Sequence, residues 1–243
     1  MTSVLFRQET ETKDAWKDFR TRFCQLAMEC ADGVRVVIPK HGHVYNSGRD
    51  SHVYFILEGQ VKLVVNAANG KRCLLAVCTR GDLVGECSLA GAERMETAVA
   101  LRRTVVRRVG ADRFLDALTE HGMLEGYLAY KSAQLLHQQG VIADMVTMES
   151  ERRLAACLLG LSRLIGTPVS HQVHIDTRLT QEELAEMVGT TRSRVGYFLK
   201  GFRAAGLVEL TRKSTLLVDE RGLADYVQGC RPRPGAHRMR TAA

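Results

Sequence analysis

The stretch from Leu179 to Phe202, LTQEELAEMVGTTRSRVGYFLKGF, constrains the fold more than any other part of the chain. Thr180 followed by Glu183 has the spacing of a capping box, which predicts the start of a first helix. Gly189 predicts its end, because glycine adopts the left-handed backbone of a sharp turn without steric cost. One of the two threonines that follow then caps a second helix. The stretch therefore predicts two helices joined by a tight turn.

The second predicted helix has two contrasting faces. Its apolar face, at helical spacing, consists of Val195, Phe198, Leu199 and Phe202. The other face has cations, a hydroxyl and an aromatic ring but no acid, and consists of Arg192, Ser193, Gly196, Tyr197 and Lys200. Arginine can pair with a guanine edge, and lysine and threonine suit phosphates. An ordinary helical corner with a solvated outer face is the alternative. The caps, the turn glycine and the acid-free face together favour a helix-turn-helix that enters the major groove of DNA.

The charge of the chain favours a polyanionic partner. The net charge is +7, and residues 149–243 hold 15 Lys and Arg against 10 Asp and Glu, whereas residues 1–148 hold 19 against 17. The excess therefore lies in the half that contains the two-helix motif, where DNA phosphates would need it. The seven cysteines are irregularly spaced and predict reduced thiols rather than a disulfide framework. We find no membrane span and no signal-peptide pattern, so we expect a cytoplasmic protein that does not associate with a membrane.

The first half of the chain predicts a small β domain. Apolar residues recur at helical spacing from Ala15 to Cys30, which predicts a helix packed on something larger. From Val34 to Val109, short alternating segments are separated by turn signals such as Asn69-Gly70. Many short strands of this kind form a sandwich or a barrel.

A long helix is predicted from Leu124. The residues Leu124, Leu128, Lys131, Leu135, Gln138, Ile142 and Met145 are spaced alternately by four and three. This is a heptad pattern over about three repeats, which favours a coiled-coil dimer. Its two polar members would lower stability but fix the register. A single amphipathic helix packed on its own domain is the alternative.

The C-terminal part predicts a further helix over residues 150–165, ended by Gly166 to Pro168, and a short strand at Val173 to Ile175. Residues 207–210 and 216–218 predict a two-stranded wing with a basic tip at Arg212 and Lys213. The tail over residues 230–243 is basic and interrupted by proline, and we expect it to be disordered.

With these elements in this order, residues 34–218 resemble the CRP/FNR family of bacterial transcription regulators. The resemblance is carried by VYFILEGQVKLVV followed by NG, by GDLVGECSL, by ETAVAL and, most specifically, by the helix-turn-helix segment. It implies an α+β fold with a β-roll sensor domain over residues 14–120 and a dimerisation helix over 121–148. It also implies a winged helix-turn-helix domain over 149–229. The implied function is a homodimer that binds a palindromic operator in double-stranded DNA, with RNA polymerase as a further partner.

The resemblance extends to part of the phosphate cassette of the members that bind cAMP. Gly85 and Glu86 match its beginning, and Thr97 and Ala98 match its end. Glu96, however, stands where the family has its phosphate-binding arginine, and a carboxylate there would repel a cyclic phosphate. Arg94, two residues away, offers a partial replacement if the backbone is extended. The residues implied for an effector pocket are Gly85, Glu86, Cys87, Ser88, Glu96, Thr97, Gln138 and Gln139.

The effector itself stays open at this stage. Glu96 disfavours cyclic AMP. It favours either another small effector in the same cavity or no ligand at all. Redox sensing could involve Cys73 and Cys78, and haem ligation could use these cysteines or His41, His43 and His52. An iron–sulfur cluster needs clustered N-terminal cysteines, which Cys24 and Cys30 alone do not supply.

The family's functional residues match this sequence better in the DNA-binding part than in the phosphate cassette. Thr191 matches the family's cap beside a phosphate, and Arg192 matches its base-reading arginine. Ser193 and Tyr197 replace two readout residues of the cAMP receptor, so we expect an operator that differs from the TGTGA half-site. The residues expected to contact DNA are Thr180, Thr190, Thr191, Arg192, Ser193, Arg194, Tyr197, Lys200, Arg212 and Lys213.

The competing function is an enzyme regulated by a cyclic-nucleotide module. The chain has no GK[ST] phosphate loop, no HExxH and no GxSxG motif, and only about 25 residues follow the wing. The sequence therefore predicts a regulator without enzymatic activity, either responsive to an effector or independent of one.

Overall fold

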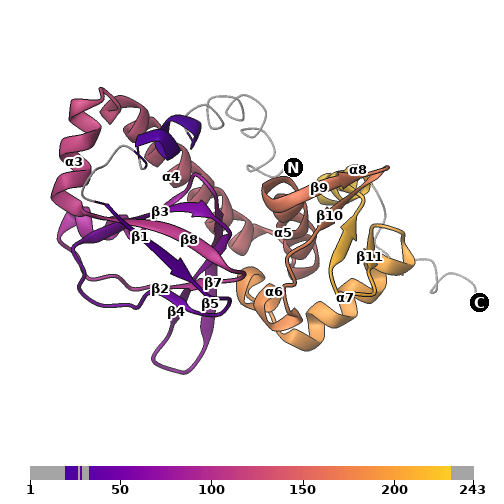
Figure 1. Ribbon diagram of the computed structural model, residues 1–243. Coiled ribbons are helices and arrows are strands. Elements are labelled where there is room, and N and C mark those ends of the chain that lie inside the picture. Colours follow the sequence, from indigo (N-terminus) through magenta and orange to yellow (C-terminus); the bar gives the residue numbers. More distant parts are fainter. Residues whose placement is uncertain (1–19, 27, 29–32, 231–243) are drawn as a thin grey trace, which may run out of the picture. The chain divides into compact units, whose positions relative to one another are not determined.

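The computed structural model describes residues 20–26, 28 and 33–230, and the chain divides into two compact units between Gln138 and Gln139. The first contains the strands of the predicted β domain and the second contains the helix-turn-helix (Figure 1). The predicted α+β class, with a β-roll, a long helix and a winged helix-turn-helix, is confirmed. The tail over 231–243, the residues before 20 and Cys30 lie outside the described residues.

Two antiparallel four-stranded sheets form the β-roll. The first has the order β1-β8-β3-β6, with β1 (Val34–Ile38), β8 (Thr104–Gly110), β3 (His52–Glu58) and β6 (Leu83–Val84). The second has the order β2-β7-β4-β5, with β2 (His43–Tyr45), β7 (Thr97–Ala100), β4 (Gln60–Asn66) and β5 (Arg72–Thr79). The 3-10 helix η1 (Glu86–Ala90) connects β6 towards β7.

Strand β3 is central because both of its faces are buried. Tyr54 and Ile56 belong to the apolar cluster that also draws residues from the second sheet, whereas Val53 and Phe55 belong to a cluster with the helices. Successive side chains of a strand point to opposite faces, so one strand can serve two cores. The alternation of Val53, Phe55 and Leu57 in the sequence identified one of these faces, the one that packs on the helices.

Three helical segments cover the outer face of the first sheet. They are the helix at 20–26, α3 (Ala111–Glu120) and the N-terminal part of α4 (Leu124–Thr147). Phe23 is fully buried, and its ring centroid lies 5.0 Å from that of Phe55 and 5.9 Å from that of Phe114. Tyr127 of α4 stacks on the same ring at 6.2 Å, and Tyr130 contacts it in a tilted arrangement at 6.1 Å. The aromatic cluster therefore fixes α4 on the β-roll.

The turn between β3 and β4 requires glycine. Gly59 has φ of 90°, and a Cβ atom there would lie 2.6 Å from the carbonyl oxygen of Arg103. A side chain would therefore meet both backbone strain and a backbone collision.

The second unit is a winged helix. A four-stranded antiparallel sheet has the order β11-β12-β10-β9, with β11 (Val208–Leu210), β12 (Leu216–Val218), β10 (Gln172–Ile175) and β9 (Gly166–Val169). Its helices are α5 (Ser150–Ile165), α6 (Gln181–Val188), α7 (Arg192–Ala204) and α8 (Glu220–Gln228). Strand β9 was not predicted, because Gly166 to Pro168 indicated only the end of α5. Proline is tolerated there because β9 is an edge strand.

Within the described residues, no helix combines the length and the apolar character needed to cross a bilayer.

Replacing Phe23 with Ala should destabilise the β-roll by about 3–5 kcal/mol, because it empties a fully buried ring site shared by several aromatic side chains. Urea unfolding followed by circular dichroism would measure the loss. Met28→Ala is the control, since Met28 is 62% exposed and its loss should change stability by no more than about 0.5 kcal/mol. Equal effects of the two substitutions would contradict the assignment of Phe23 to the core.

Candidate nucleic-acid interface and effector cavity

The first helix of the helix-turn-helix begins at the predicted capping box. The hydroxyl of Thr180 accepts a hydrogen bond from the Glu183 backbone N–H (3.1 Å), and the Glu183 carboxylate accepts one from the Thr180 N–H (2.7 Å). Gly189 ends α6 in the left-handed conformation, with φ of 63°. Both local predictions are confirmed, and they fix the position of the turn.

Helix α7 presents the acid-free face to solvent. Thr191 is its N-cap and accepts from the Arg194 N–H at 3.4 Å, while Thr190 lies in the turn. The buried face consists of Val195, Phe198 and Phe202, with Leu199 partly buried beside them. Exposed on the helix are Arg192, Ser193, Arg194, Tyr197 and Lys200. The predicted division of the two faces is therefore observed.

Two aromatic contacts shape this exposed face. Tyr197 is 75% exposed, and its ring centroid lies 6.0 Å from that of Phe198. The guanidinium of Arg194 lies 5.5 Å from the Phe198 ring centroid, within the range of a cation–π contact. Arg194 is thereby held at the side of the helix, whereas Arg192 extends from its N-terminal turn.

The wing has a hydroxyl-stabilised turn and a basic tip. The Thr211 and Thr215 hydroxyls are 2.6 Å apart, and the Thr215 N–H donates to the Thr211 hydroxyl at 3.2 Å. His174 of β10 contacts the Thr215 hydroxyl at 2.8 Å. Arg212 and Lys213 lie between the two threonines and are exposed, as predicted.

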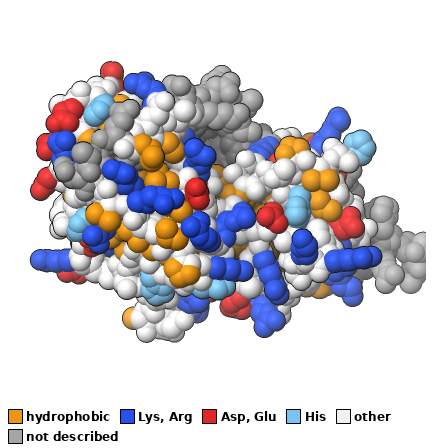
Figure 2. Space-filling model, viewed as in Figure 1, with side chains coloured by type: hydrophobic (Ala, Val, Ile, Leu, Met, Phe, Trp, Pro, Cys, Tyr) orange, Lys and Arg blue, Asp and Glu red, His pale blue; other side chains and the backbone are white. Residues whose placement is uncertain are grey.

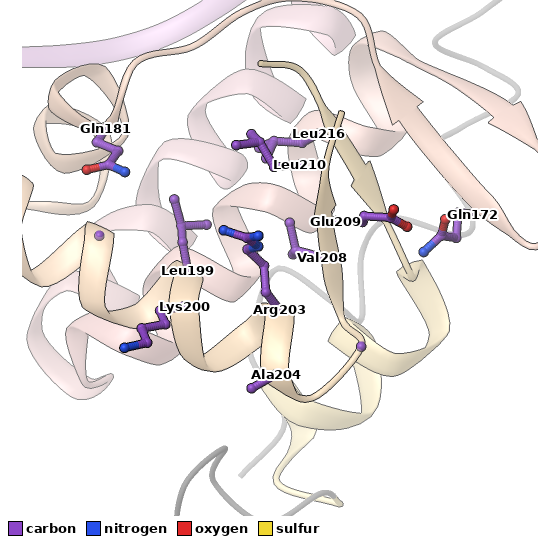
Figure 3. Close-up of a pocket in the computed structure, with 12 residues that line it drawn as sticks. Gln172, Gln181, Leu199, Lys200, Arg203, Ala204, Val208, Glu209, Leu210 and Leu216 are labelled. Carbon is purple, nitrogen blue, oxygen red and sulfur yellow. The ribbon is translucent and has the colours of Figure 1, made fainter. Parts of the chain in front are cut away.

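A groove of about 730 Å³, which the sequence did not predict, lies between α7 and the wing strands (Figure 3). Arg203 extends from α7 between Leu199 and Val208. Gln181 and Lys200 lie on the left of the view. Gln172 and Glu209 complete the polar lining. Helical spacing could have indicated Arg203, which lies three residues beyond Lys200, but the wing strand that makes it part of a groove is distant in sequence.

The basic surface of this unit depends on where its charged residues lie more than on its net charge. Four of the 15 cations in residues 149–243 lie at Arg231, Arg233, Arg238 and Arg240, outside the described residues. The described part is nearly neutral, yet α7 itself has no acid. Lys and Arg side chains are prominent on the surface around α6 and α7 in Figure 2. The separation of charge within the domain therefore provides a basic surface.

The predicted effector residues Gly85 to Ser88 form the start of η1. Gly85 has φ of 84°, and a Cβ atom there would lie 3.0 Å from the Arg94 guanidinium. Ser88 donates to the Gly85 carbonyl (2.9 Å), so its hydroxyl supports the turn. Thr97 accepts a hydrogen bond from the Ser47 N–H (3.2 Å). Two of the hydroxyls expected in the pocket therefore have partners within the protein.

Glu96 is buried and bonded to a tyrosine. It is 8% exposed, and the Tyr45 hydroxyl donates to its carboxylate at 3.0 Å. Burial, and then the charge of Glu96, raises the pKa of Tyr45 far above its usual range. The tyrosine therefore stays protonated and keeps donating, which holds a negative group where the resemblance implies a phosphate-binding cation.

Arg94 does not replace the missing cation, contrary to the partial replacement considered from sequence. It is 2% exposed, donates to the Asp50 carboxylate (2.6 Å) and to the carbonyls of His52 and Gly85, and lies 4.3 Å from the Tyr45 ring centroid. The backbone of Arg94 forms an isolated antiparallel bridge with Gly48. Its charge is therefore neutralised inside the protein.

Asp50 is the acceptor that holds this arginine. It also accepts hydrogen bonds from Tyr54 (2.7 Å) and from the backbone N–H of His52, whose ring nitrogen lies 2.7 Å away. Burial alone would raise the pKa of Asp50, but the hydrogen bonds from His52, Tyr54 and Arg94 outweigh burial and hold it far below its usual range. The carboxylate is consequently charged at neutral pH and forms an ion pair with Arg94.

Glu86 pairs with α4 through residues other than the predicted glutamines. The Lys131 ammonium lies 2.6 Å from the Glu86 carboxylate and 2.6 Å from the Gln134 side-chain oxygen. Gln134 in turn donates to the Tyr130 hydroxyl at 2.8 Å. Gln138 and Gln139 are exposed on the helix. Lys131 was predicted as a polar member of the dimer seam, but in the single chain its charge is directed at the β-roll.

Helix α4 nevertheless has an exposed apolar stripe. Leu124, Leu128, Leu135 and Ile142 are between 45% and 65% exposed. Met145, predicted to continue the seam, is partly buried, and its sulfur would lie 3.2 Å from a Cβ atom at Gly189. Val146 is 82% exposed beside it. Packing against the helix-turn-helix therefore explains the departure at the end of the seam.

The cysteines do not form the redox pair considered from sequence. Cys73 and Cys78 lie five residues apart on β5, roughly 17 Å along an extended strand, whereas a disulfide needs Cα atoms within about 7 Å. Burial raises the pKa of the Cys78 thiol well above its usual range. Burial, and then the charges of Glu96 and Glu86, raises that of Cys87. Both thiols are therefore protonated and poorly reactive.

Two of the histidines considered for haem have polar partners within the protein. His52 contacts Asp50, and His43 lies 2.5 Å from the Asn46 side-chain oxygen. Among the residues that the structure describes, no group of three His, Cys, Asp or Glu side chains is arranged to hold a metal ion.

These surfaces define a winged-helix protein with a β-roll of the cyclic-nucleotide-binding type. Residues 35–121 match the family described as cyclic nucleotide-binding domain, and residues 152–226 match the Crp-like helix-turn-helix domain. The CRP-like cAMP-activated global transcriptional regulator of Mycobacterium tuberculosis is 31% identical over 195 residues, which cover 78% of this chain and 86% of that protein. The chain therefore belongs to the CRP/FNR family and is a DNA-binding transcription regulator with a sensor domain.

Further relatives agree with this assignment. The global nitrogen regulator of Synechocystis is 28% identical over 169 residues, which cover 66% of this chain and 73% of that protein. Among solved structures, the c-di-GMP-responsive regulator CLP of Xanthomonas campestris has a TM-score of 0.68 at 19% identity, covering 82% of this chain and 98% of that one. A CRP/FNR-family regulator of Thermus thermophilus has a TM-score of 0.65 at 24% identity, covering 82% and 100%. At these identities the solved structures show the shared fold.

Replacing Arg203 with Ala should reduce the slope of log affinity against log salt by about one, because a groove cation that neutralises a phosphate releases about one counterion. Fluorescence anisotropy over a salt series would measure the slope. Arg221→Ala removes the same charge from α8, outside the groove, and serves as the control. An unchanged slope for Arg203→Ala, or an equal decrease in the control, would place the phosphate path elsewhere.

Proposed function

We propose that the protein is a cytoplasmic, non-enzymatic homodimer that binds a palindromic operator and acts on RNA polymerase at the promoter. The observation that carries this proposal is the exposed, acid-free face of α7 at the end of a well-capped helix-turn-helix. The N-terminal turn of such a helix approaches base edges in the major groove, and the wing tip and the groove suit the flanking phosphates.

The exposed stripe of α4 supports the dimer. Leu128, Leu135 and Ile142 are each more than half exposed in the single chain. Burial of one such side chain contributes about 1.5–3 kcal/mol. Pairing of two α4 helices along this stripe would bury the set twice and place two recognition helices on one DNA duplex.

Arg192→Ala should weaken operator binding by about 1–3 kcal/mol and relax preference at one position in each half-site, since Arg192 is the exposed arginine of the first turn of α7. Selection of bound sequences from a random library, for both proteins, would measure the change. Arg212→Ala is the control: loss of a wing-tip cation should weaken all sequences to a similar extent. An unchanged sequence preference in Arg192→Ala would remove Arg192 from base readout.

We further propose that the β-roll responds to a small effector without a cyclic phosphate. Relatives of this fold are described as cAMP-activated and as c-di-GMP-responsive, so the fold itself does not fix the ligand. In this chain the buried Glu96 carboxylate and the neutralised Arg94 leave the cassette without an available cation. Lys131 is already paired with Glu86.

A second candidate is a regulator that acts without an effector. It is favoured by the Asp50–Arg94 pair. The Arg94 guanidinium beneath Gly85 already binds a carboxylate of the protein and is not available to an anionic ligand. Titration calorimetry with cell extract fractions separates the two candidates, because saturable binding of any small molecule to the β-roll eliminates the second.

Glu96→Arg should create cAMP binding that the wild-type protein lacks. The substitution replaces like-charge repulsion with a charge-assisted hydrogen bond worth about 1.5–3 kcal/mol, so we expect a gain in affinity of about 10- to 150-fold. Titration calorimetry with cAMP would measure it, and Glu96→Gln, which only removes the repulsion, should gain less.

Glu93→Gln is the matched control for that experiment, because Glu93 is exposed and pairs with Arg49 at the surface. It should leave the response to cAMP unchanged. Tight binding of cAMP by the wild-type protein would show that Glu96 does not exclude a cyclic phosphate.

A further inference from the structure

Arg153 joins the ends of two helices. It lies in the first turn of α5, and its Nη1 donates to the carbonyl of Met145 (3.3 Å) in the last turn of α4 and to that of Met148 (2.5 Å), the residue just after α4. Its Nε donates to the carbonyl of Val188 (2.9 Å), the last residue of α6, and Nη2 lies 3.5 Å from the carbonyl of Gly189. One guanidinium therefore contacts the end of the long helix and the turn of the helix-turn-helix.

Two of these carbonyls, those of Met145 in α4 and Val188 in α6, belong to the last turn of a helix, where carbonyls lack internal partners. The last four C=O groups of a helix lack an intrahelical donor and carry a partial negative charge. Arginine suits two such ends at once, because its five N–H donors are fixed in a planar fork. Lysine, with a compact ammonium group, cannot reproduce the same set of directions.

A second contact joins the same two segments. Gly189 at the turn has no side chain, and a Cβ atom there would lie 3.2 Å from the sulfur of Met145. The close approach of α4 to the turn therefore depends on glycine on one side and on the Arg153 hydrogen bonds on the other. Burial, and then the charge of Arg194 on α7, lowers the pKa of Arg153, and the charge of Asp144 acts in the opposite direction.

We propose that Arg153 is a positioning residue that fixes the angle between the end of α4 and the helix-turn-helix, and thereby sets the half-site separation that the dimer prefers. This inference rests on the proposed function, in which two chains pair along α4. In such a dimer, whatever joins α4 to the turn decides how far apart the two recognition helices lie. The hydrogen bonds that Arg153 donates to Met145, Met148, Val188 and Gly189 all go to backbone carbonyls, so it acts through the turn rather than on DNA.

The experiment uses the full-length protein and duplexes that carry two selected half-sites at separations changed one base pair at a time. Affinity is measured at each separation for wild type, Arg153→Ala, Arg153→Lys and Arg152→Ala. Arg152→Ala removes the same charge from the neighbouring position and is the matched control. Circular dichroism and a salt series accompany each variant.

Wild type and Arg152→Ala should share one preferred separation. Arg153→Ala should lose about tenfold in affinity at that separation, equivalent to about 1.4 kcal/mol, and little at the others, so that the profile flattens while the salt slope stays unchanged. Arg153→Lys should fold as wild type does and give an intermediate profile, which keeps the test valid if the alanine variant is unstable.

Two results would overturn the inference, and they differ from each other. A sharp profile that survives in both Arg153 variants would overturn the positioning role alone. A wild-type protein without any preferred separation would overturn the proposed dimer together with the inference that rests on it.

Discussion

Packing of one helix face decides what the opposite face can do throughout this protein. In α7, burial of Val195, Phe198 and Phe202 forces the arginines, Ser193 and Tyr197 into solvent. In α4, Tyr127 and Tyr130 pack on Phe23 and leave the leucines exposed. A helix with 3.6 residues per turn cannot bury both sets at once, so each functional surface is the side left by the core.

In the β-roll, a buried charge likewise has both a structural and a functional consequence. Arg94 would be costly in an apolar interior, and it is accommodated because Asp50, two backbone carbonyls and an aromatic ring surround it. This arrangement stabilises the floor of the cassette beneath Gly85. It also removes the cation from any role in binding an anion, so structural support and ligand choice are linked through a single side chain.

Within each unit, one cation joins elements that are distant in sequence. Lys131 attaches one section of α4 to the Glu86 carboxylate in the β-roll, and Arg153 attaches the end of α4 to the turn between α6 and α7. Both contacts use a cation that spans elements distant in sequence. Both are charge-assisted and geometrically specific contacts.

The sequence by itself determined the local features. The Thr180–Glu183 capping box, the turn at Gly189, the two faces of α7 and the β4–β5 hairpin at Gly70 are encoded by neighbouring residues, whose spacing alone fixes the geometry. Only the tertiary structure decided the rest. The partner of Arg94, the direction of Lys131, the packing of Met145, the edge strand β9 and the groove beside Arg203 each depend on contacts between residues far apart in the chain. Such contacts follow from how the elements pack together, and no local periodicity records them.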